Sequence, residues 1–475
     1  MKNKLVAFIH LALALLLGAC QPSAAPASPP PWVTASAAQT QTLQGVDTTL
    51  TLGEANGQVL RPLLGVNVGP APSGDAGNPD LTEAYRAIGV TLIRTHDFYG
   101  PLDMAVMYPD RLRDPADPAS YEFQASDAQW QAIVQGGFEP YFRLGDSWNN
   151  ATPPANAAER ANWVNAAIAV VRHYRQGQWD GFTTPFRYVE IWNEPDNTQF
   201  WPHPHTPEAF NQLYVEAALA LKQAFPDLIV GGPGVTPAGA LAPHGQKWVR
   251  AFLDAVKQQG APLDFFSWHL YANEPSEWAG AAQFYRRELD ERGFQAVAQH
   301  VTEWNTAVEQ SNDKGPEARA LRTGGKGAAI LTAAWIAMQQ NGVTEALFYR
   351  GPDPSMNLTT FYGMFYANGQ PKRIAQAFPL WKQLAAHPQQ LTITATPETG
   401  LWLLAGQNES GEIALLVANP TQKVVRYRLV GIESSSGTLL QIDDDGEHAL
   451  SLPPGEPEAV LLIGAETVQL LVLSP

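Results

Sequence analysis

Short apolar segments alternate with longer amphipathic segments between about residues 60 and 351. The longer segments repeat their apolar residues every three or four positions, which predicts helices, and the short ones have the length of buried strands. One helix start is marked by Thr206, a capping residue, followed by Pro207 at the first helical position. Eight strands are expected, at residues 63–68, 91–95, 139–144, 187–192, 228–232, 265–270, 296–302 and 345–349. Helices are expected between them, at residues 162–174, 207–224, 246–259, 278–292 and 327–341.

This alternation predicts an α/β fold with parallel strands. Eight strand–helix units over about 290 residues fit the size of a (β/α)8 TIM barrel, and we assign residues 60–385 to it. An open, doubly wound sheet is the alternative, because periodicity alone does not distinguish the two layouts.

The pattern changes after the predicted barrel. Residues 386–475 contain short strand-like runs separated by turn residues, with no helical stretch, which predicts a small C-terminal antiparallel β-sandwich. Residues 43–59 hold a further strand, which we expect to associate with the sandwich. The runs of the sandwich itself lie at 401–407, 413–418, 424–429, 438–442 and 460–464.

The first 20 residues have the pattern of an export signal. Two lysines precede an apolar run of 13 residues, at 5–17, interrupted only by His10. This run is shorter than the ~18 residues of a spanning helix and is typical of a signal peptide. The following Leu-Gly-Ala-Cys resembles the bacterial lipobox, whereas an ordinary secretory signal with an incidental cysteine is the alternative. We expect a signal peptide at 1–19, lipidated Cys20 and a Pro/Ala/Ser-rich tether at 20–42, and an exported bacterial lipoprotein anchored at the cell surface or in the periplasm.

Composition narrows the choice of partner. The chain has 30 Lys and Arg against 46 Asp and Glu, a net charge of −16, which argues against a nucleic acid partner. Its single cysteine excludes a disulfide framework and any metal site with several cysteines. Fourteen tryptophans supply flat apolar faces of the kind on which sugar rings stack. We expect a carbohydrate partner, a membrane contact through the lipid anchor, and no metal or organic cofactor; the oligomeric state stays open.

Two acidic residues stand at the carboxyl ends of the fourth and seventh predicted strands. The fourth strand ends in Ile-Trp-Asn-Glu-Pro and the seventh in Thr-Glu-Trp-Asn. Closure of a barrel places Glu194 and Glu303 at opposite sides of one pocket. Glycosidic bond cleavage needs two such carboxyl groups, one to protonate the leaving oxygen and one to attack or to activate water. For each residue alone, a helix cap or a solvated loop charge is the structural alternative.

These two segments resemble the acid/base and nucleophile motifs of the retaining clan A glycoside hydrolases. The chain is similar, over roughly residues 60–384, to family 39 of that clan, which includes β-xylosidases, α-L-iduronidases and exopolysaccharide hydrolases. The resemblance implies a barrel followed by a sandwich, and double displacement with Glu194 as acid/base and Glu303 as nucleophile. Arg-Thr-His at 94–96 and His-Leu-Tyr at 269–271 resemble further segments of that family, which implies sugar contacts for His96, His269 and Tyr271.

Other pocket residues follow from their places at strand ends. We expect Arg94 and the amide of Asn193 to hold the nucleophile and the sugar 2-hydroxyl. Trp201 and Trp304 are the tryptophans expected to stack on sugar rings. Tyr349, on the eighth strand, is assigned to substrate binding at a position where family members often carry tryptophan.

The acid/base carboxyl has to hold a proton at rest. The pKa of Glu194 is therefore expected above the ~4.3 of a free glutamate, raised by the nearby charge of Glu303.

Two functions of other classes compete with hydrolysis. A non-catalytic carbohydrate-binding surface lipoprotein would need aromatic and hydrogen-bonding groups but not two carboxyl groups in register. A cell-surface adhesion or scaffold module built around the acidic sandwich would leave the barrel unexplained. We therefore predict a retaining glycoside hydrolase that cleaves O-glycosidic bonds of an oligo- or polysaccharide.

Overall fold

The computed structural model describes residues 45–72, 79–148, 151–308, 314–431, 436–452 and 460–475. The expected signal peptide, Cys20 and the tether lie outside these residues. Within the described part, no helix has both the length and the apolar character that crossing a membrane requires.

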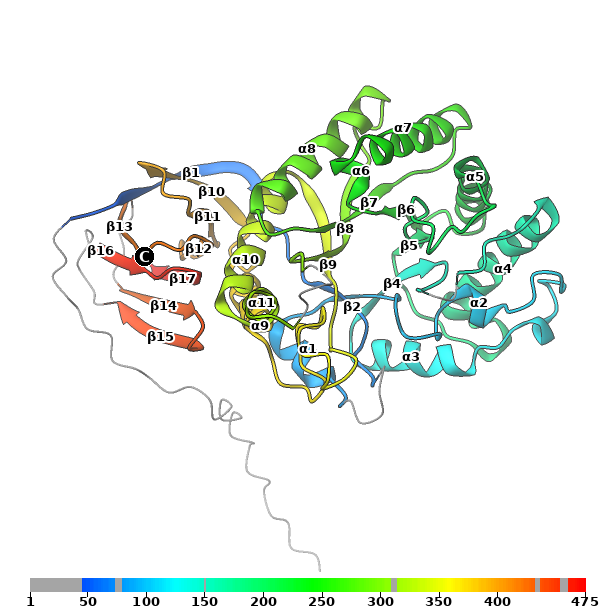
Figure 1. Ribbon diagram of the computed structural model, residues 1–475, viewed down its shortest axis with the longest axis horizontal. Coiled ribbons are helices and arrows are strands. Elements are labelled where there is room, and N and C mark those ends of the chain that lie inside the picture. Colours follow the sequence, from blue (N-terminus) through cyan, green and yellow to red (C-terminus); the bar gives the residue numbers. More distant parts are fainter. Residues whose placement is uncertain (1–44, 73–78, 149–150, 309–313, 432–435, 453–459) are drawn as a thin grey trace, which may run out of the picture. The chain divides into compact units, whose positions relative to one another are not determined.

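Eight parallel strands close into a barrel in the order in which they occur along the chain (Figure 1). The prediction of a (β/α)8 barrel is thus confirmed, and the open sheet is ruled out. The strands are β2 (Gly65–Asn67), β3 (Leu92–Arg94), β4 (Glu139–Leu144), β5 (Tyr188–Ile191), β6 (Ile229–Val235), β7 (Phe265–Tyr271), β8 (Ala298–Asn305) and β9 (Val343–Phe348).

Helices surround the barrel strands, as Figure 1 shows for α3 to α8. The helix predicted at 207–224 is α5, and the Thr206 hydroxyl caps it by accepting from the backbone N–H of Ala209. The helices of the described residues are α1 (Thr82–Ile88), α2 (Met104–Met107), α3 (Gln124–Gln135), α4 (Ala157–Gln176), α5 (Pro207–Ala224), α6 (Ala238–Leu241), α7 (Pro243–Gln258), α8 (Pro275–Glu291), α9 (Pro316–Thr323), α10 (Gly325–Gln340) and α11 (Arg373–Ala385).

The barrel interior changes from apolar to polar along its axis. Large side chains from five of the strands fill one end: Leu92, Tyr141, Tyr188, Phe265 and Leu347. Toward the carboxyl ends of the strands the interior becomes charged, with fully buried Arg94 and Glu190. Active sites of such barrels form at this end, so the charged layer marks where a site is expected.

A separate, mostly antiparallel sheet holds the C-terminal residues together with β1 (Thr48–Val59). β1 pairs antiparallel with β10 and parallel with β13. Hydrogen bonding runs continuously through nine strands, and the sheet has its own apolar core, which includes Leu50, Leu415 and Leu471. The other strands are β10 (Gln389–Thr396), β11 (Trp402–Gln407), β12 (Ile413–Asn419), β13 (Val425–Val430), β14 (Ser436–Ile442), β15 (Glu447–Leu452), β16 (Val460–Ile463) and β17 (Thr467–Ser474).

Candidate active site

Arg94, at the end of β3, organises the charged layer. Its Nε donates to Glu190 Oε2 at 2.6 Å, and its Nη1 donates to Glu303 Oε1 at 2.8 Å and to Asn67 Oδ1 at 3.1 Å. Its Nη2 donates to Asn193 Oδ1 at 2.7 Å. Because a guanidinium group is planar and rigid, these bonds fix the two carboxylates and the Asn193 amide relative to each other.

Glu190, on β5, fixes the position of Arg94 through their hydrogen bond. It is fully buried, and its Oε1 accepts from the hydroxyls of Ser267 at 2.6 Å and Thr302 at 2.9 Å. Gly234 lies against this cluster with a φ of +65°, and a Cβ there would come within 3.3 Å of Glu190 Oε1. A glycine is therefore required at this position by both its backbone conformation and the close approach.

Glu303, on β8, projects into the barrel and receives hydrogen bonds from several strands. Tyr271, on β7, donates its hydroxyl to Glu303 Oε2 at 2.7 Å. His96 Nε2 lies 3.2 Å from Glu303 Oε1, the oxygen that also accepts from Arg94. The Glu303 side chain is 6% exposed, so it is almost completely enclosed by these partners.

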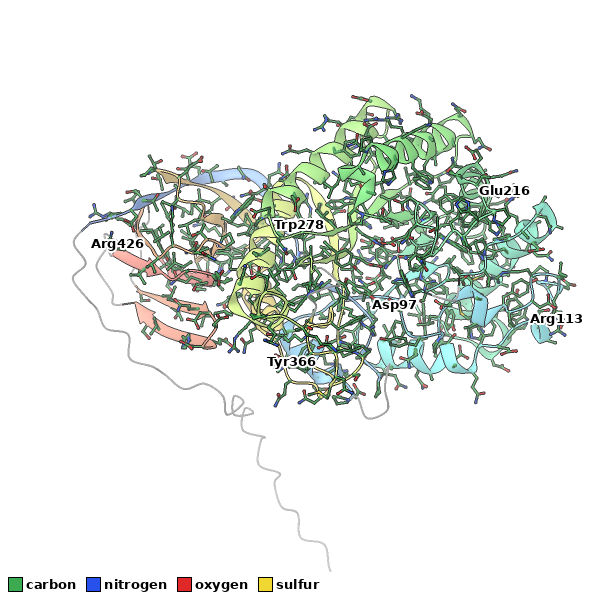
Figure 2. The ribbon with its side chains drawn as sticks, in the orientation of Figure 1. Asp97, Arg113, Glu216, Trp278, Tyr366 and Arg426 are labelled. Atoms are coloured by element: carbon green, nitrogen blue, oxygen red, sulfur yellow. The ribbon has the colours of Figure 1, made fainter. Side chains whose placement is uncertain are left out.

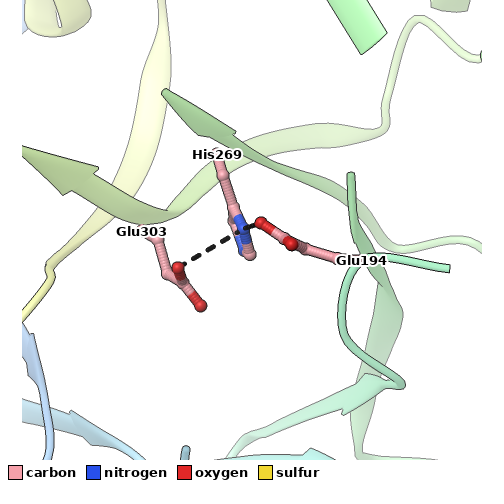
Figure 3. A group of neighbouring side chains, drawn as sticks. All are labelled: Glu194, His269 and Glu303. Carbon is pink, nitrogen blue, oxygen red and sulfur yellow. Dashed lines mark hydrogen bonds and ion pairs between the residues drawn. The ribbon is translucent and has the colours of Figure 1, made fainter. Parts of the chain in front are cut away.

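Glu194 follows β5 and faces Glu303 across the ring of His269 (Figure 3). His269 Nδ1 lies 2.9 Å from Glu194 Oε1 and 3.6 Å from Glu303 Oε2, and Asn197 donates to Glu194 Oε2 at 2.8 Å. One carboxyl oxygen of each glutamate and a ring nitrogen of His269 all lie within 4.8 Å of one another. Glu194 has a φ of +43°, a conformation that is unfavourable for a side chain of this size and that clusters at functional sites.

The protonation of Glu194 is set by burial. Burial raises the pKa of Glu194 to about 7, although the hydrogen bond from Asn197 and the charge of Arg94 lower it. The expected direction is found, but the expected cause is not, because burial rather than the charge of Glu303 is the main contribution. Glu194 can therefore hold a proton up to about neutral pH.

Glu303 has a different environment. Burial raises its pKa as well, but the charges of His269 and Arg94 and the hydrogen bond from Tyr271 oppose that rise. The Arg94 cation and the Tyr271 hydroxyl stabilise the carboxylate form of Glu303, whereas Glu194 has fewer such partners. The two carboxyl groups are thus placed in environments that separate their protonation states.

Glu194, His269 and Glu303 also form the one group of described residues whose ligand atoms are close enough to hold a metal ion. The contacts that Glu303 already makes there disfavour a metal ion. Arg94 Nη1 places a positive charge 2.8 Å from Glu303 Oε1, and the Tyr271 hydroxyl is bonded to the other oxygen of Glu303.

Asn193 Nδ2 is buried without a hydrogen-bond partner among the described residues, so it is available to a hydroxyl of a ligand.

Tyr349 follows β9 and lies beside the glutamates. Its ring centroid is 6.5 Å from that of His96 and 6.2 Å from that of Tyr271, and its side chain is largely buried. Its hydroxyl donates to Asp97 Oδ2. Its assignment to substrate binding stays a prediction, because no sugar contact is observed.

Trp304 does not lie in the pocket, and the prediction that it stacks on a sugar is wrong. The side chain is fully buried and packs against Trp335 of α10 and Phe348 of β9, with ring centroids 5.1 and 5.2 Å away. Apart from an irregularity at Thr302, which also points into the barrel, successive residues of this strand point to opposite faces. Since Glu303 faces the barrel interior, Trp304 has to face the surrounding helices.

Trp201 is likewise part of the packing rather than an open stacking face. It is 5% exposed, and its ring meets Trp192 and Phe210 edge to face, each with centroids 5.3 Å apart. Its Nε1 donates to the backbone carbonyl of Thr206. The structure therefore assigns Trp201 to stabilising the segment between β5 and α5.

Several residues of the site were missed by the sequence analysis. Glu190 and Asn67 position Arg94, Asn197 bonds to Glu194, and Asp97 lies beside His96. Glu190 had a detectable signal, because an acid within the apolar run Tyr-Val-Glu-Ile is unusual unless it is paired.

Comparison with known proteins shows similarity to one family of glycoside hydrolases. A family model described as glycosyl hydrolases family 39 matches residues 64–309. A curated protein described as a β-xylosidase, from Geobacillus stearothermophilus, is 26% identical over 266 residues, which cover 46% of this chain and 50% of that protein. The chain spans about half the length of the curated relatives it matches.

Solved structures extend the similarity to most of the chain. A glucosidase from Croceicoccus marinus is 25% identical with a TM-score of 0.72, covering 91% of this chain and 100% of the other. A β-xylosidase from Caulobacter crescentus CB15 is 17% identical with a TM-score of 0.66, covering 90% and 99%, and it shows a shared fold alone.

Proposed function

Because the chain belongs to glycosyl hydrolases family 39, we propose that it is a retaining glycoside hydrolase with Glu194 as acid/base and Glu303 as nucleophile. The observation that carries this proposal is the short distance between the two carboxyl groups, of which one oxygen each lies within 4.8 Å. Retaining enzymes hold their carboxyl groups about 5–5.5 Å apart, whereas inverting enzymes leave ~6.5–9.5 Å for a water molecule. The spacing favours direct attack by a carboxylate.

The reaction proceeds in two steps. In the first, a carboxylate oxygen of Glu303 forms a bond to the anomeric carbon while the bond to the leaving oxygen breaks, and Glu194 gives its proton to that oxygen. In the second, the Glu194 carboxylate takes a proton from water, whose oxygen replaces Glu303 on the anomeric carbon. Arg94 holds Glu303 in place for the attack, and the free amide hydrogens of Asn193 are placed to bind the sugar 2-hydroxyl.

The configuration of the first-formed sugar tests this mechanism. The purified protein, incubated with 4-nitrophenyl β-D-xyloside or β-D-glucoside, is expected to release the β-anomer first, because two inversions at the anomeric carbon restore its configuration. Proton NMR recorded within minutes, before mutarotation, distinguishes the anomers. Initial release of the α-anomer would show a single displacement by water and contradict the role given to Glu303.

The expected lipid anchor rests on the sequence, and we propose that Cys20 carries it. Bacteria that express the full chain and are grown with a radiolabelled fatty acid are expected to incorporate the label into the protein. The Cys20→Ser variant is expected to lose the label, because serine provides no thiol for a thioether link, whereas Ser23→Ala should keep it. Labelling of the Cys20→Ser variant, or no labelling of either protein, would contradict lipidation at this residue.

A further inference from the structure

A third carboxyl group lies at the wall of the pocket, and neither catalytic step uses it. Asp97, labelled in Figure 2, follows β3. Its side chain is 15% exposed. Its Oδ1 lies 3.7 Å from His96 Nε2, and the same nitrogen lies 3.2 Å from the nucleophile oxygen Glu303 Oε1. One nitrogen of His96 thus lies close to both Asp97 and the nucleophile.

Asp97 is held in a fixed position. The hydroxyl of Tyr349 donates to its Oδ2, and its backbone N–H donates to the Ser147 hydroxyl at 3.0 Å. Its φ of +57° is uncommon for a residue other than glycine, although aspartate and asparagine tolerate it. Such strained positions cluster at ligand-binding sites, where the strain places a side chain that an ordinary conformation would not.

A buried cation stands behind this carboxyl group. Arg350 is 1% exposed, its Nη1 donates to the Tyr99 hydroxyl at 2.6 Å, and its charge acts on Asp97. Its Nε and Nη2 have no hydrogen-bond partner among the described residues. Because the guanidinium group is covered whereas the Asp97 side chain is partly exposed, a ligand can reach Asp97 but not Arg350.

We infer that Asp97 is a specificity-determining residue, which accepts a hydrogen bond from a hydroxyl of the sugar ring remote from the anomeric carbon. The inference rests on the proposed glycosidase function and deepens it. Asn193 is placed for the 2-hydroxyl, so the 3- and 4-hydroxyls are those left for Asp97. The occupant is a neutral sugar, because Asp97 and Glu303 together disfavour an anionic one.

Deoxy substrates test this assignment. Hydrolysis of 4-nitrophenyl β-D-xyloside and β-D-glucoside is compared with that of their 3-deoxy and 4-deoxy forms, for the wild type and for Asp97→Asn. This substitution keeps the size of the side chain and tolerates the positive φ. A hydrogen bond to a charged group corresponds to about 10- to 150-fold in kcat/KM, so the wild type is expected to lose this factor on one deoxy form.

The Asp97→Asn variant distinguishes the loss of one sugar contact from a general loss of activity. Asp97→Asn is expected to lose at least about tenfold on the parent glycoside but to match the wild type on that one deoxy form, since the bond is already absent there. Asp254→Asn, which removes the same charge near the C-terminal end of α7, serves as the control and should behave as the wild type.

Two outcomes overturn the inference. Equal losses of Asp97→Asn on parent and deoxy substrates would reject recognition by Asp97 while leaving the glycosidase function intact. Equal kcat/KM of the wild type on the parent and on both deoxy forms would show that Asp97 binds neither hydroxyl, again with the glycosidase function intact.

Discussion

Replacing Glu303 by alanine is expected to lower kcat/KM by about 10⁴- to 10⁶-fold on every glycoside that the wild type hydrolyses. The variant lacks the oxygen that bonds to the anomeric carbon, so no glycosyl-enzyme forms, whatever the leaving group. Steady-state kinetics on an alkyl glycoside and on an activated aryl glycoside measure the loss. Glu216→Ala, which removes a partly exposed glutamate of α5, is the matched control and is expected to keep full activity.

The loss has to be separated from unfolding. Arg94 keeps its bonds to Glu190 and Asn193 when Glu303 is shortened, so the thermal unfolding curve is expected to keep its cooperative shape. Azide offers a second check, because it fits the space left by the carboxylate. The Glu303→Ala variant with azide is expected to convert a β-glycoside into the α-glycosyl azide, and a β-product would place the nucleophile elsewhere.

The barrel was predictable because its pattern is local. Buried parallel strands are short apolar runs, and the covering helices show their own period, so both can be read from neighbouring residues. The C-terminal sheet was predicted less completely, since β10, β15 and β17 were not among the expected strands. Strand β10 alternates apolar and polar residues, whereas β17 is a nearly continuous apolar run at the chain end.

The two glutamates and their first partners were predictable for a different reason. Glu194 and Glu303 stand at strand ends, and the parallel strands of a barrel bring their carboxyl ends to one face. The prediction for Trp304 fails because a place at the end of a strand does not say to which face of the strand the side chain points. Alternation from Glu303 to Trp304 predicts the opposite orientation, although it fails one residue earlier, where Thr302 also faces the interior.

The electrostatics of the site could not be obtained from the sequence. The pKa of Glu194 depends on how completely its side chain is removed from water, which no local pattern reports. In the same way, the hydrogen bonds from Arg94 to Glu190 and to Glu303 link three strands that are distant in sequence. Such residues become recognisable only when the closed barrel brings them together.

Replacing Glu194 by alanine is expected to change the rate according to the leaving group. Proton transfer contributes roughly 10²- to 10⁴-fold, so alkyl glycosides should lose about this factor. An activated aryl glycoside, whose leaving oxygen departs without a proton, should still form the glycosyl-enzyme rapidly. The intermediate should then accumulate, because deglycosylation lacks its base, and mass spectrometry of the quenched reaction should find the sugar on the peptide that contains Glu303.

The pH dependence of kcat/KM tests whether Glu194 supplies the proton to the leaving oxygen. Only the protonated form gives a proton to the leaving oxygen, and its pKa is about 7. For the wild type, kcat/KM on alkyl glycosides should therefore fall tenfold for each pH unit above about 7, and this limb should vanish in Glu194→Ala. Glu194→Gln, which keeps the size of the side chain, should lose the limb as well.

Azide distinguishes the two alanine variants by stereochemistry. In Glu194→Ala it attacks the glycosyl-enzyme from the face that water normally uses, which restores the original configuration and gives the β-glycosyl azide. The same anion gives the α-product in Glu303→Ala, because it there replaces the nucleophile. Opposite products from the two variants require that the two carboxyl groups act on opposite faces of one sugar. The same anomer from both variants, or a sugar label on a peptide without Glu303, would mean that the roles are assigned wrongly.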